Sequence, residues 1–486
     1  MQPFFVENFT VYARPEVRLE DSVFSPFSLR LRILAQTHAL HRPWLRLSGL
    51  NTLSSRRLRL LQRLLQSYGV NSNNQYYMEE NKFLKLFPQI KCDAIMFGKG
   101  KRLRRGGMCS ERNRFVMKTF HIKTKILIGS DSMTYLSGLE NKTLWIICDG
   151  FLKDSGGLQH VIDHVHESNR VEIYTDVVPE PPLESVIKGI KRMTELEPDV
   201  IIALGGGSAI DTAKGIIFFS LKMGVSAESF IAIPTTSGTG SEVTSITVIT
   251  DTQNKVKIPI QDYAITPDIA ILDPQFTLSV PYNVTANTGM DVLTHAIEAY
   301  VAQNSTLCSD GMAEKAVQLV VEYLPMCCQE LQNAHFREVM HNASTMAGIA
   351  FDIAGLGLNH SIAHQIGAHF HIPHGLANSI LLPHVIEFNS AHSLNACAKY
   401  AHLARLIGVV NNLSPDFLAV NALSKAFAKL MQQLKMPRSL AEFGVTKEQV
   451  IPLTNLIADQ ALQDICLTSN PCKATYEDIV RIVAKL

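Results

Sequence analysis

The sequence contains little charge and no strong excess of either sign. Only 18% of its 486 residues are Asp, Glu, Lys or Arg, and the formal net charge is +1. No run approaches the roughly 18 consecutive apolar residues of a membrane-spanning helix, so we expect no membrane insertion. The nine cysteines are odd in number and form no Cys-x-x-Cys pair, which argues against a disulfide framework and a thiolate zinc site. These absences favour a reducing compartment such as the cytoplasm.

Apolar residues make up 46% of the chain, which is ample material for a hydrophobic core and excludes disorder of the whole sequence. Charge is nevertheless distributed unevenly along the chain. Residues 1–116 contain 20 Lys and Arg against 8 Asp and Glu, whereas residues 117–486 contain 25 against 36. This asymmetry predicts two segments of different physical character.

Residues 1–116 show no core-forming pattern beyond one basic amphipathic helix, expected at about 54–68. The stretch from Met1 to Ala13 lacks the basic and apolar regions of a secretory signal peptide. The helix could serve targeting, or bind nucleic acid or an acidic surface. We favour the alternative that residues 1–116 are disordered or are translated upstream of the native start, because Met117 opens a segment that looks like an N-terminus.

From Met117 to about residue 282, short apolar strands alternate with amphipathic helices. Such alternation is typical of parallel βαβ units and predicts a doubly wound, Rossmann-like α/β domain over 117–282. Helical patterns then dominate and predict an all-helical domain over 283–486. The two domains would meet at a cleft, the usual place for a cofactor and a substrate. Strands are expected at 119–128, 144–148, 171–174, 200–204 and 230–233, and helices at 186–195 and 210–223.

Three features at the ends of predicted strands point to a nucleotide. Asp149 ends a buried-type strand, where a carboxylate can accept hydrogen bonds from ribose hydroxyls and repel a 2′-phosphate. Gly205-Gly-Gly-Ser208 joins a strand to a helix, so its backbone can approach a pyrophosphate. The hydroxyl-rich run 235–241 follows another strand. Each feature alone also fits an ordinary turn or solvent loop, and no Gly-x-Gly-x-x-Gly fingerprint is present, but their convergence at one sheet edge favours a nucleotide.

The spacing of aspartate and histidine predicts a metal site. Asp291 and His295 are four residues apart and share a helix face, and His360 and His364 repeat that spacing. Five of the 17 histidines fall in the stretch from His360 to His374. One carboxylate and several imidazoles suit a borderline divalent ion such as Fe²⁺ or Zn²⁺, with an open position for water or a substrate oxygen.

Together, several motifs are similar to those of the iron-containing (group III) alcohol dehydrogenases. They are Gly205-Gly-Gly-Ser-Ala-Ile-Asp211, Pro234–Glu242, Thr288–Glu298, Gly357–His360 and His374–Asn378. The resemblance covers 117–486 and none of 1–116, and it implies a dehydroquinate synthase-like architecture. Within the family, the segments 145–152 and 341–345 most resemble the propanol dehydrogenases of bacterial propanediol utilisation. The alcohol dehydrogenases of ethanolamine utilisation are near neighbours.

The resemblance implies roles for individual residues. The metal ligands would be Asp291, His295, His360 and His374, and His364 would be a catalytic imidazole beside the metal. Asp149 would select NAD over NADP. Further cofactor contacts would come from Gly205, Gly206, Gly207, Ser208, Asp211, Thr235, Thr236, Ser237 and Thr239. Two positions depart from the family pattern, namely Asp352, where a small or amide residue is expected, and Cys472, where relatives have arginine.

The implied reaction is the reversible, NAD(H)-linked interconversion of a short primary alcohol and its aldehyde, with 1-propanol and propanal as the first expectation. The metal would polarise the carbonyl oxygen while hydride arrives from the nicotinamide. The cofactor ribose hydroxyl and His364 would relay the proton. Ethanol oxidation and lactaldehyde reduction are the alternatives at the same site, and the ligand types leave both Fe²⁺ and Zn²⁺ open.

A lyase of the dehydroquinate synthase type, or a hydroxyacid–oxoacid transhydrogenase, would need basic residues to hold an acidic substrate. No Lys or Arg lies between Phe351 and Leu382, which favours a small uncharged alcohol or aldehyde. A non-enzymatic binding role of the basic segment 1–116 is the alternative of a different class. We expect a homo-oligomer without nucleic-acid or membrane partners. The cytoplasm is the expected location, with a bacterial microcompartment and its enzymes as the alternative.

Overall fold

The computed structural model describes residues 44–46, 77–79, 118–252 and 256–486. The chain divides into two compact units, Met1–Asn113 and Arg114–Leu486. In the first unit, two three-residue strands, β1 (Trp44–Arg46) and β2 (Tyr77–Glu79), pair in antiparallel fashion. The sequence patterns predict neither strand, and the helix expected at about 54–68 lies outside the described residues.

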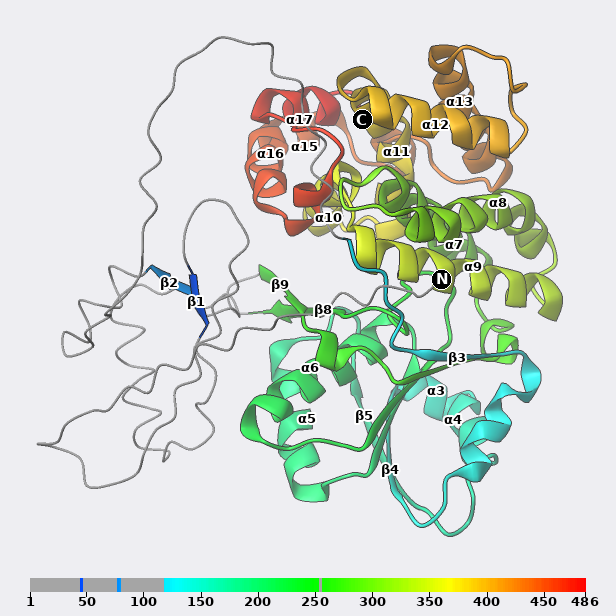
Figure 1. Ribbon diagram of the computed structural model, residues 1–486, viewed down its shortest axis with the longest axis vertical. Coiled ribbons are helices and arrows are strands. Elements are labelled where there is room, and N and C mark those ends of the chain that lie inside the picture. The colour runs from blue at the N-terminus through cyan, green and yellow to red at the C-terminus, as the bar shows by residue number, and fades with distance from the viewer. Residues whose placement is uncertain (1–43, 47–76, 80–117, 253–255) are drawn as a thin grey trace, which may run out of the picture. The chain divides into compact units, whose positions relative to one another are not determined.

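The second unit contains a six-stranded sheet in which all neighbouring strands are parallel (Figure 1). The strand order is β3-β10-β7-β6-β4-β5, so chain order reverses within the sheet, as in doubly wound folds. Its strands are β3 (Lys125–Ile128), β4 (Thr143–Asp149), β5 (Arg170–Val177), β6 (Val200–Gly205), β7 (Ser229–Pro234) and β10 (Ile269–Leu272).

Both faces of the sheet are covered, which explains why its central strands are apolar throughout. Alternate residues of β6 enter opposite hydrophobic clusters, with Ile201 and Ala203 on one face and Ile202 and Leu204 on the other. A strand buried on both faces carries a continuous apolar run rather than an alternating one. The doubly wound α/β fold predicted from the sequence is confirmed. The flanking helices are η2 (Ser130–Gly138), α3 (Gly150–Asp154), α4 (Gly157–Ile162), α5 (Leu183–Leu196) and α6 (Gly207–Met223).

Three strands that follow β7 were not expected from the sequence patterns. β8 (Ile246–Asp251) and β9 (Val256–Gln261) form an antiparallel hairpin apart from the main sheet, and β10 inserts between β3 and β7. β10 has only four residues, all buried, so no alternating pattern marks it. The strand expected at 119–128 is shorter than predicted, because only its last four residues pair with β10.

The helical region begins with α7 (Tyr282–Val301) and lies to one side of the sheet in Figure 1. α8 (Leu307–Gln329) and α9 (Ala334–Ala354) pack with α7, and their buried side chains belong to one large hydrophobic cluster. The other helices are α10 (Leu358–Phe370), α11 (His374–His392), α12 (Leu394–Leu406), α13 (Asp416–Gln433), α14 (Leu440–Phe443), α15 (Lys447–Val450), α16 (Thr454–Gln463) and α17 (Tyr476–Val483). Short 3-10 helices are η3 (Tyr263–Ile265), η4 (Pro274–Thr277), η5 (Ile451–Leu453) and η6 (Ile465–Ser469).

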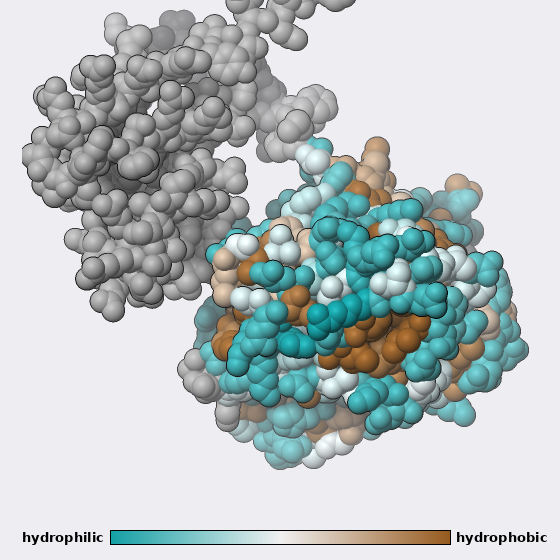
Figure 2. Space-filling view, turned by 90° about the horizontal axis from the view of Figure 1, so that it is seen from below, coloured by the Kyte–Doolittle hydropathy of each residue, from teal (hydrophilic) through white to brown (hydrophobic). Residues whose placement is uncertain are grey.

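A smaller hydrophobic cluster joins the sheet to the helices. It contains Val243, Ala270 and Leu272 from the α/β region and Ile349 from α9, so the two regions pack directly against each other. Figure 2 shows a largely hydrophilic face of this unit with a hydrophobic area among the polar residues. Within the described ranges, every helix is too short or too polar to cross a bilayer.

Candidate active site

Two of the predicted metal ligands lie on α7. Asp291 and His295 are one helical turn apart, so their side chains project from the same face. Both residues are buried, each with only 5% of its surface exposed. A buried carboxylate needs polar partners, and Asn378 Nδ2 supplies one by donating to Asp291 Oδ1 at 2.7 Å. α7 therefore presents a carboxylate and an imidazole together inside the helical region.

The other two predicted ligands come from α10 and α11. His360 lies in the first turns of α10 and is buried, whereas His374 begins α11 and has 44% of its side chain exposed. The ligand atoms of these two residues and of Asp291 and His295 lie within 4.8 Å of one another. Asn378 Nδ2 lies 2.7, 3.0 and 3.2 Å from Asp291 Oδ1, His360 Nε2 and His374 Nε2, so these atoms converge on one region.

This donor set fits a divalent transition metal. Burial lowers the pKa of His295 and of His360, so these imidazoles are neutral at physiological pH and have a nitrogen lone pair for a cation. Three imidazoles and one carboxylate suit either Fe²⁺ or Zn²⁺. Of these four residues, only His374 is exposed to solvent.

Glu298, which the sequence analysis did not select, supports the centre from α7. It is 3% exposed, its Oε2 accepts a hydrogen bond from His360 Nδ1, and its Oε1 accepts one from the Asn359 backbone N–H at 2.7 Å. A carboxylate at Nδ1 favours the tautomer whose Nε2 is free to bind a metal. By accepting the Asn359 N–H, Glu298 also caps the N-terminus of α10. The N-cap residue itself, Gly357, has no side chain that could do so. The sequence could have indicated Glu298 by its spacing alone, since it follows Asp291 by seven residues and lies on the same helix face.

His364, the predicted catalytic imidazole, lies beside the four clustered residues. It is one turn after His360, and its ring stacks on that of His374 with centroids 5.4 Å apart. Its Nδ1 is 2.7 Å from Asp464 Oδ2, and 30% of the His364 side chain is exposed. No sequence pattern indicates Asp464, because it lies 100 residues further along the chain.

The predicted cofactor residues meet at the carboxyl ends of three adjacent strands. Asp149 ends β4, Gly205 ends β6, and the 235–239 segment follows β7. These strands are neighbours in the order β7-β6-β4. Carboxyl ends of neighbouring parallel strands form one edge, where ligands of open α/β sheets bind.

The two carboxylate oxygens of Asp149 have different surroundings. Its Oδ1 accepts a hydrogen bond from the Leu152 N–H at 2.9 Å and caps α3, as expected of a strand-end turn residue. Its Oδ2 lies 4.0 Å from the place that a Cβ on Gly205 would occupy. One carboxylate oxygen therefore faces the glycine loop while the other stabilises the local turn.

The glycines permit the two loops of this edge to pack together. A Cβ on Gly206 would lie 3.2 Å from Thr236 Oγ1, and one on Gly207 would lie 2.7 Å from Thr239 Cγ2. Gly205 has a φ of +150°, which other residues rarely adopt. α6 starts with no side-chain cap and no acidic residue in its first turn, so its N-terminal N–H groups and positive dipole can attract an anion.

Two predicted cofactor residues have partners within the protein. Asp211 Oδ2 accepts a hydrogen bond from the Val248 N–H at 3.1 Å, which ties α6 to β8. Ser237 Oγ is 2.9 Å from His341 Nδ1 and links its loop to α9.

The two departures from the family pattern also have structural partners. Asp352 Oδ1 accepts hydrogen bonds from the Ser245 N–H at 2.7 Å and the Ser245 hydroxyl at 2.8 Å. Cys472 Sγ lies 3.3 Å from Asn389 Oδ1. Neither side chain belongs to the cluster of Asp291, His295, His360 and His374.

Comparison with known proteins identifies the class. Residues 123–274 match the family described as iron-containing alcohol dehydrogenase, and residues 285–486 match the C-terminal part of the Fe-containing alcohol dehydrogenase family. The 1-propanol dehydrogenase of Citrobacter freundii is 45% identical over 370 residues, which cover 76% of this chain and 100% of that protein.

Solved structures agree with these matches. The iron-containing alcohol dehydrogenase of Thermococcus thioreducens has a TM-score of 0.69 at 32% identity, covering 76% of this chain and 99% of that one. The sulfoacetaldehyde reductase of Bifidobacterium kashiwanohense, solved in complex with NAD⁺, has a TM-score of 0.67 at 28% identity, with 76% and 99% covered. The fold and the site thus define a metal-dependent oxidoreductase. The chain belongs to the iron-containing alcohol dehydrogenase family.

Proposed function

We propose that the protein is an NAD(H)-linked alcohol dehydrogenase that interconverts propanal and 1-propanol in propanediol degradation. The observation that most supports this proposal is the convergence of Asp291, His295, His360 and His374, whose ligand atoms lie within 4.8 Å of one another. The 45% identity to the 1-propanol dehydrogenase of Citrobacter freundii favours this substrate within the family.

The preference for NAD over NADP follows from Asp149. Its Oδ2, beside Gly205, is a suitable acceptor for a ribose 2′-hydroxyl and would repel a 2′-phosphate. The pyrophosphate would lie at the uncapped N-terminus of α6, where Gly206 and Gly207 present backbone rather than side chains. The NAD⁺ complex of the Bifidobacterium kashiwanohense relative is consistent with this choice.

In the proposed mechanism, aldehyde, NADH and a proton give primary alcohol and NAD⁺. A divalent ion held by the four ligands supplies a Lewis acid for the substrate oxygen when it is bound. The doubly protonated ring of His364 would give its Nε2 proton to the substrate oxygen during aldehyde reduction, and the neutral ring would take one from the alcohol during oxidation. Asp464 accepts a hydrogen bond from Nδ1 of His364, which orients the ring and directs Nε2 away from Asp464.

The surroundings favour a small uncharged substrate. No Lys or Arg lies in the 351–382 segment, which carries His360, His364 and His374. Lys257, a cation close enough to influence His374, is already paired with Glu180 at 2.7 Å. Phe351 packs against His295 with ring centroids 4.7 Å apart and adds an apolar surface. Ethanal and lactaldehyde share this chemistry and remain the alternative substrates.

An anaerobic assay of Fe²⁺-loaded, Zn²⁺-loaded and metal-free protein tests the proposal. We expect kcat/KM with NADH to be highest for propanal with Fe²⁺, lower for ethanal and lactaldehyde, and negligible without metal. Sulfoacetaldehyde is the matched anionic control and should react poorly. Equal activity without metal, or preference for the anionic aldehyde, would contradict the proposal. We also expect a homo-oligomer in light scattering, and location in the cytoplasm or a microcompartment.

A further inference from the structure

One face of α9 follows the loop that leads from β7 to β8. His341, Thr345, Gly348 and Asp352 recur every three or four residues, so they share this face. Each of them contacts the 237–245 segment of the loop. We call this set of four residues the α9 contact face.

The first two contacts are hydrogen bonds between side chains. His341 Nδ1 lies 2.9 Å from Ser237 Oγ, and the Thr345 hydroxyl donates to Glu242 Oε1 at 2.7 Å. His341, Thr345 and Glu242 are each no more than 3% exposed. Because water cannot readily replace buried hydrogen bonds, these contacts fix the loop firmly.

The third contact is a close approach of two backbones. A Cβ on Gly348 would lie 2.9 Å from Gly240 Cα and 3.0 Å from Gly240 O, and a Cβ on Gly240 would lie 2.6 Å from Gly348 Cα. Gly240 also has a φ of +63°. Val243 Cγ2 is also 2.9 Å from a Cβ on Gly348. Because the Gly240 and Gly348 atoms in the way belong to the backbone, a larger residue at either position must move the loop relative to α9.

The fourth contact holds the end of the loop from two sides. Asp352 accepts two hydrogen bonds from Ser245, at 2.7 and 2.8 Å. On the other side, Lys214 of α6 is fully buried and donates to Thr244 O, Thr244 Oγ1 and Ile246 O at 2.7, 2.9 and 2.9 Å. The segment 244–246 is therefore held between the helix that follows the glycine loop and α9.

The opposite side of the same loop faces the glycine loop. Thr236 and Thr239 are the residues nearest to a Cβ placed on Gly206 and Gly207. The loop thus turns one side to the α9 contact face and the other toward the N-terminus of α6. A shift of α9 against the loop would be transmitted to the proposed cofactor position.

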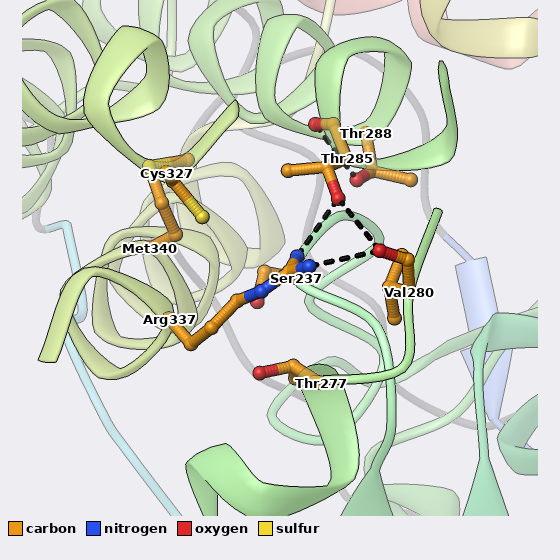
Figure 3. A pocket seen from close by; sticks show the side chains of 8 residues that line it. All are labelled: Ser237, Thr277, Val280, Thr285, Thr288, Cys327, Arg337 and Met340. Carbon is orange, nitrogen blue, oxygen red and sulfur yellow. Dashed lines mark hydrogen bonds between the residues drawn. The ribbon is translucent and has the colours of Figure 1, made fainter. Parts of the chain in front are cut away.

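α9 also contacts α7, the helix that carries Asp291 and His295. Phe351 of α9 packs against the ring of His295, with centroids 4.7 Å apart. Arg337, at the start of α9, donates to Thr285 Oγ1 and Val280 O, both at 2.8 Å, where the chain enters α7 (Figure 3). Figure 3 shows Ser237 of the cofactor loop beside this buried guanidinium.

We infer that the α9 contact face is a positioning element that sets the placement of the cofactor loop relative to the metal ligands on α7. This inference rests on the proposed function, because it takes the 235–239 segment to bind the dinucleotide. None of the four residues needs to touch the substrate, cofactor or metal to act in this way. Their effect would be on cofactor affinity and on alignment for hydride transfer.

Gly348→Ala tests the backbone contact, with Gly311→Ala on α8 as the matched control because a Cβ there has nothing within 4 Å. In the metal-loaded enzyme, Gly348→Ala should raise the NADH Kd at least about tenfold, measured by fluorescence titration, and should leave the bound metal content unchanged. Gly311→Ala should leave both unchanged. A Gly348→Ala variant that folds and binds NADH like the parent would overturn the inference.

Asp352 provides a second test that does not depend on how well Gly348→Ala folds. Asp352→Ala removes the acceptor for Ser245 and should raise the NADH KM several-fold, whereas Asp352→Asn keeps an acceptor oxygen and should restore it. An unchanged KM in Asp352→Ala, or no rescue in Asp352→Asn, would contradict the inference. Failure of the proposed function is distinguishable, because the parent enzyme would then bind no NADH.

Discussion

The proposed metal centre and the proposed cofactor edge are built by different means. The metal centre depends on specific donor atoms that project from the long helices α7, α10 and α11, and Glu298 and Asn378 hold them in orientation. The cofactor edge depends on the absence of side chains, because Gly206 and Gly207 let the backbone of one loop lie against the other. One region is defined by its chemistry and the other by its shape.

This difference predicts how each region fails. Substitution at the metal centre removes a donor, so it should abolish metal binding while the buried helices keep the fold. Substitution at the cofactor edge adds or removes one contact among several, so it should change cofactor affinity or selectivity by a smaller factor. Four experiments test this contrast, from the largest expected effect to the smallest.

His360→Ala should have the largest effect. Loss of this ligand should remove most of the bound iron and lower kcat by at least about a thousandfold, since a Lewis acid contributes several kcal/mol to the transition state. Far-UV circular dichroism should remain that of a folded protein, because α10 is held by its own apolar contacts. His369→Ala, on the same helix and bonded to Gln460 at 2.9 Å, is the matched control and should retain its iron. Global unfolding of His360→Ala would show the metal to be structural.

Glu298→Gln should have the next largest effect. The Gln side chain keeps an acceptor for the Asn359 N–H but can donate to His360 Nδ1, which favours the tautomer with a proton on the metal-binding Nε2. Metal affinity should therefore fall about 10- to 100-fold, measured by competition with a chelator. Glu314→Gln, at a carboxylate bonded to Tyr300, should bind metal like the parent. If Glu298→Gln binds the metal as tightly as Glu314→Gln, Glu298 does not support the metal ligands.

Asp149→Gly should alter selectivity rather than abolish activity. The ratio of NADH to NADPH efficiency should fall about tenfold, the effect of one charge-assisted contact. This variant also loses the hydrogen bond from the Leu152 N–H that caps α3, at a cost of roughly a few tenths of a kcal/mol of stability. Asp149→Asn separates the two effects, because it keeps an oxygen for the cap and removes the charge. An unchanged ratio in both variants would rule out Asp149 as the determinant.

The same contrast explains what the sequence could predict. Asp291, His295 and His360 could be selected because helical spacing converts residue number directly into position on a face. Glu298 was accessible to the same rule, as it continues the face of Asp291. Asp464 and Asn378 could not be selected by this rule, since their contacts with His364 and Asp291 join segments that are far apart in the chain.

The cofactor edge was only partly predictable. The strand ends at Asp149 and Gly205 follow from apolar runs and glycine, because buried parallel strands are apolar throughout. β10 was missed because four buried residues between loops carry no distinctive period. The contact between Gly240 and Gly348 could not be predicted, because its only sign in the sequence is a pair of glycines more than a hundred residues apart.

Removal of residues 1–116 should have the smallest effect and tests whether both regions are complete without them. The ranges 118–252 and 256–486 contain all four clustered ligands, His364 and the cofactor loops. Lys118 remains in a chain that starts at Met117 and donates to Gln303 O at 3.1 Å and Ser305 O at 2.7 Å. We therefore expect the truncated and full chains to agree in turnover and, within about 2 °C, in Tm, which corresponds to roughly 1.5 kcal/mol for a unit of this size. Mass spectrometry of the native protein should find its N-terminus at or near Met117. A native Met1 together with a clear loss of activity on truncation would make the segment part of the enzyme, and the basic helix predicted at about 54–68 would be the first region to test.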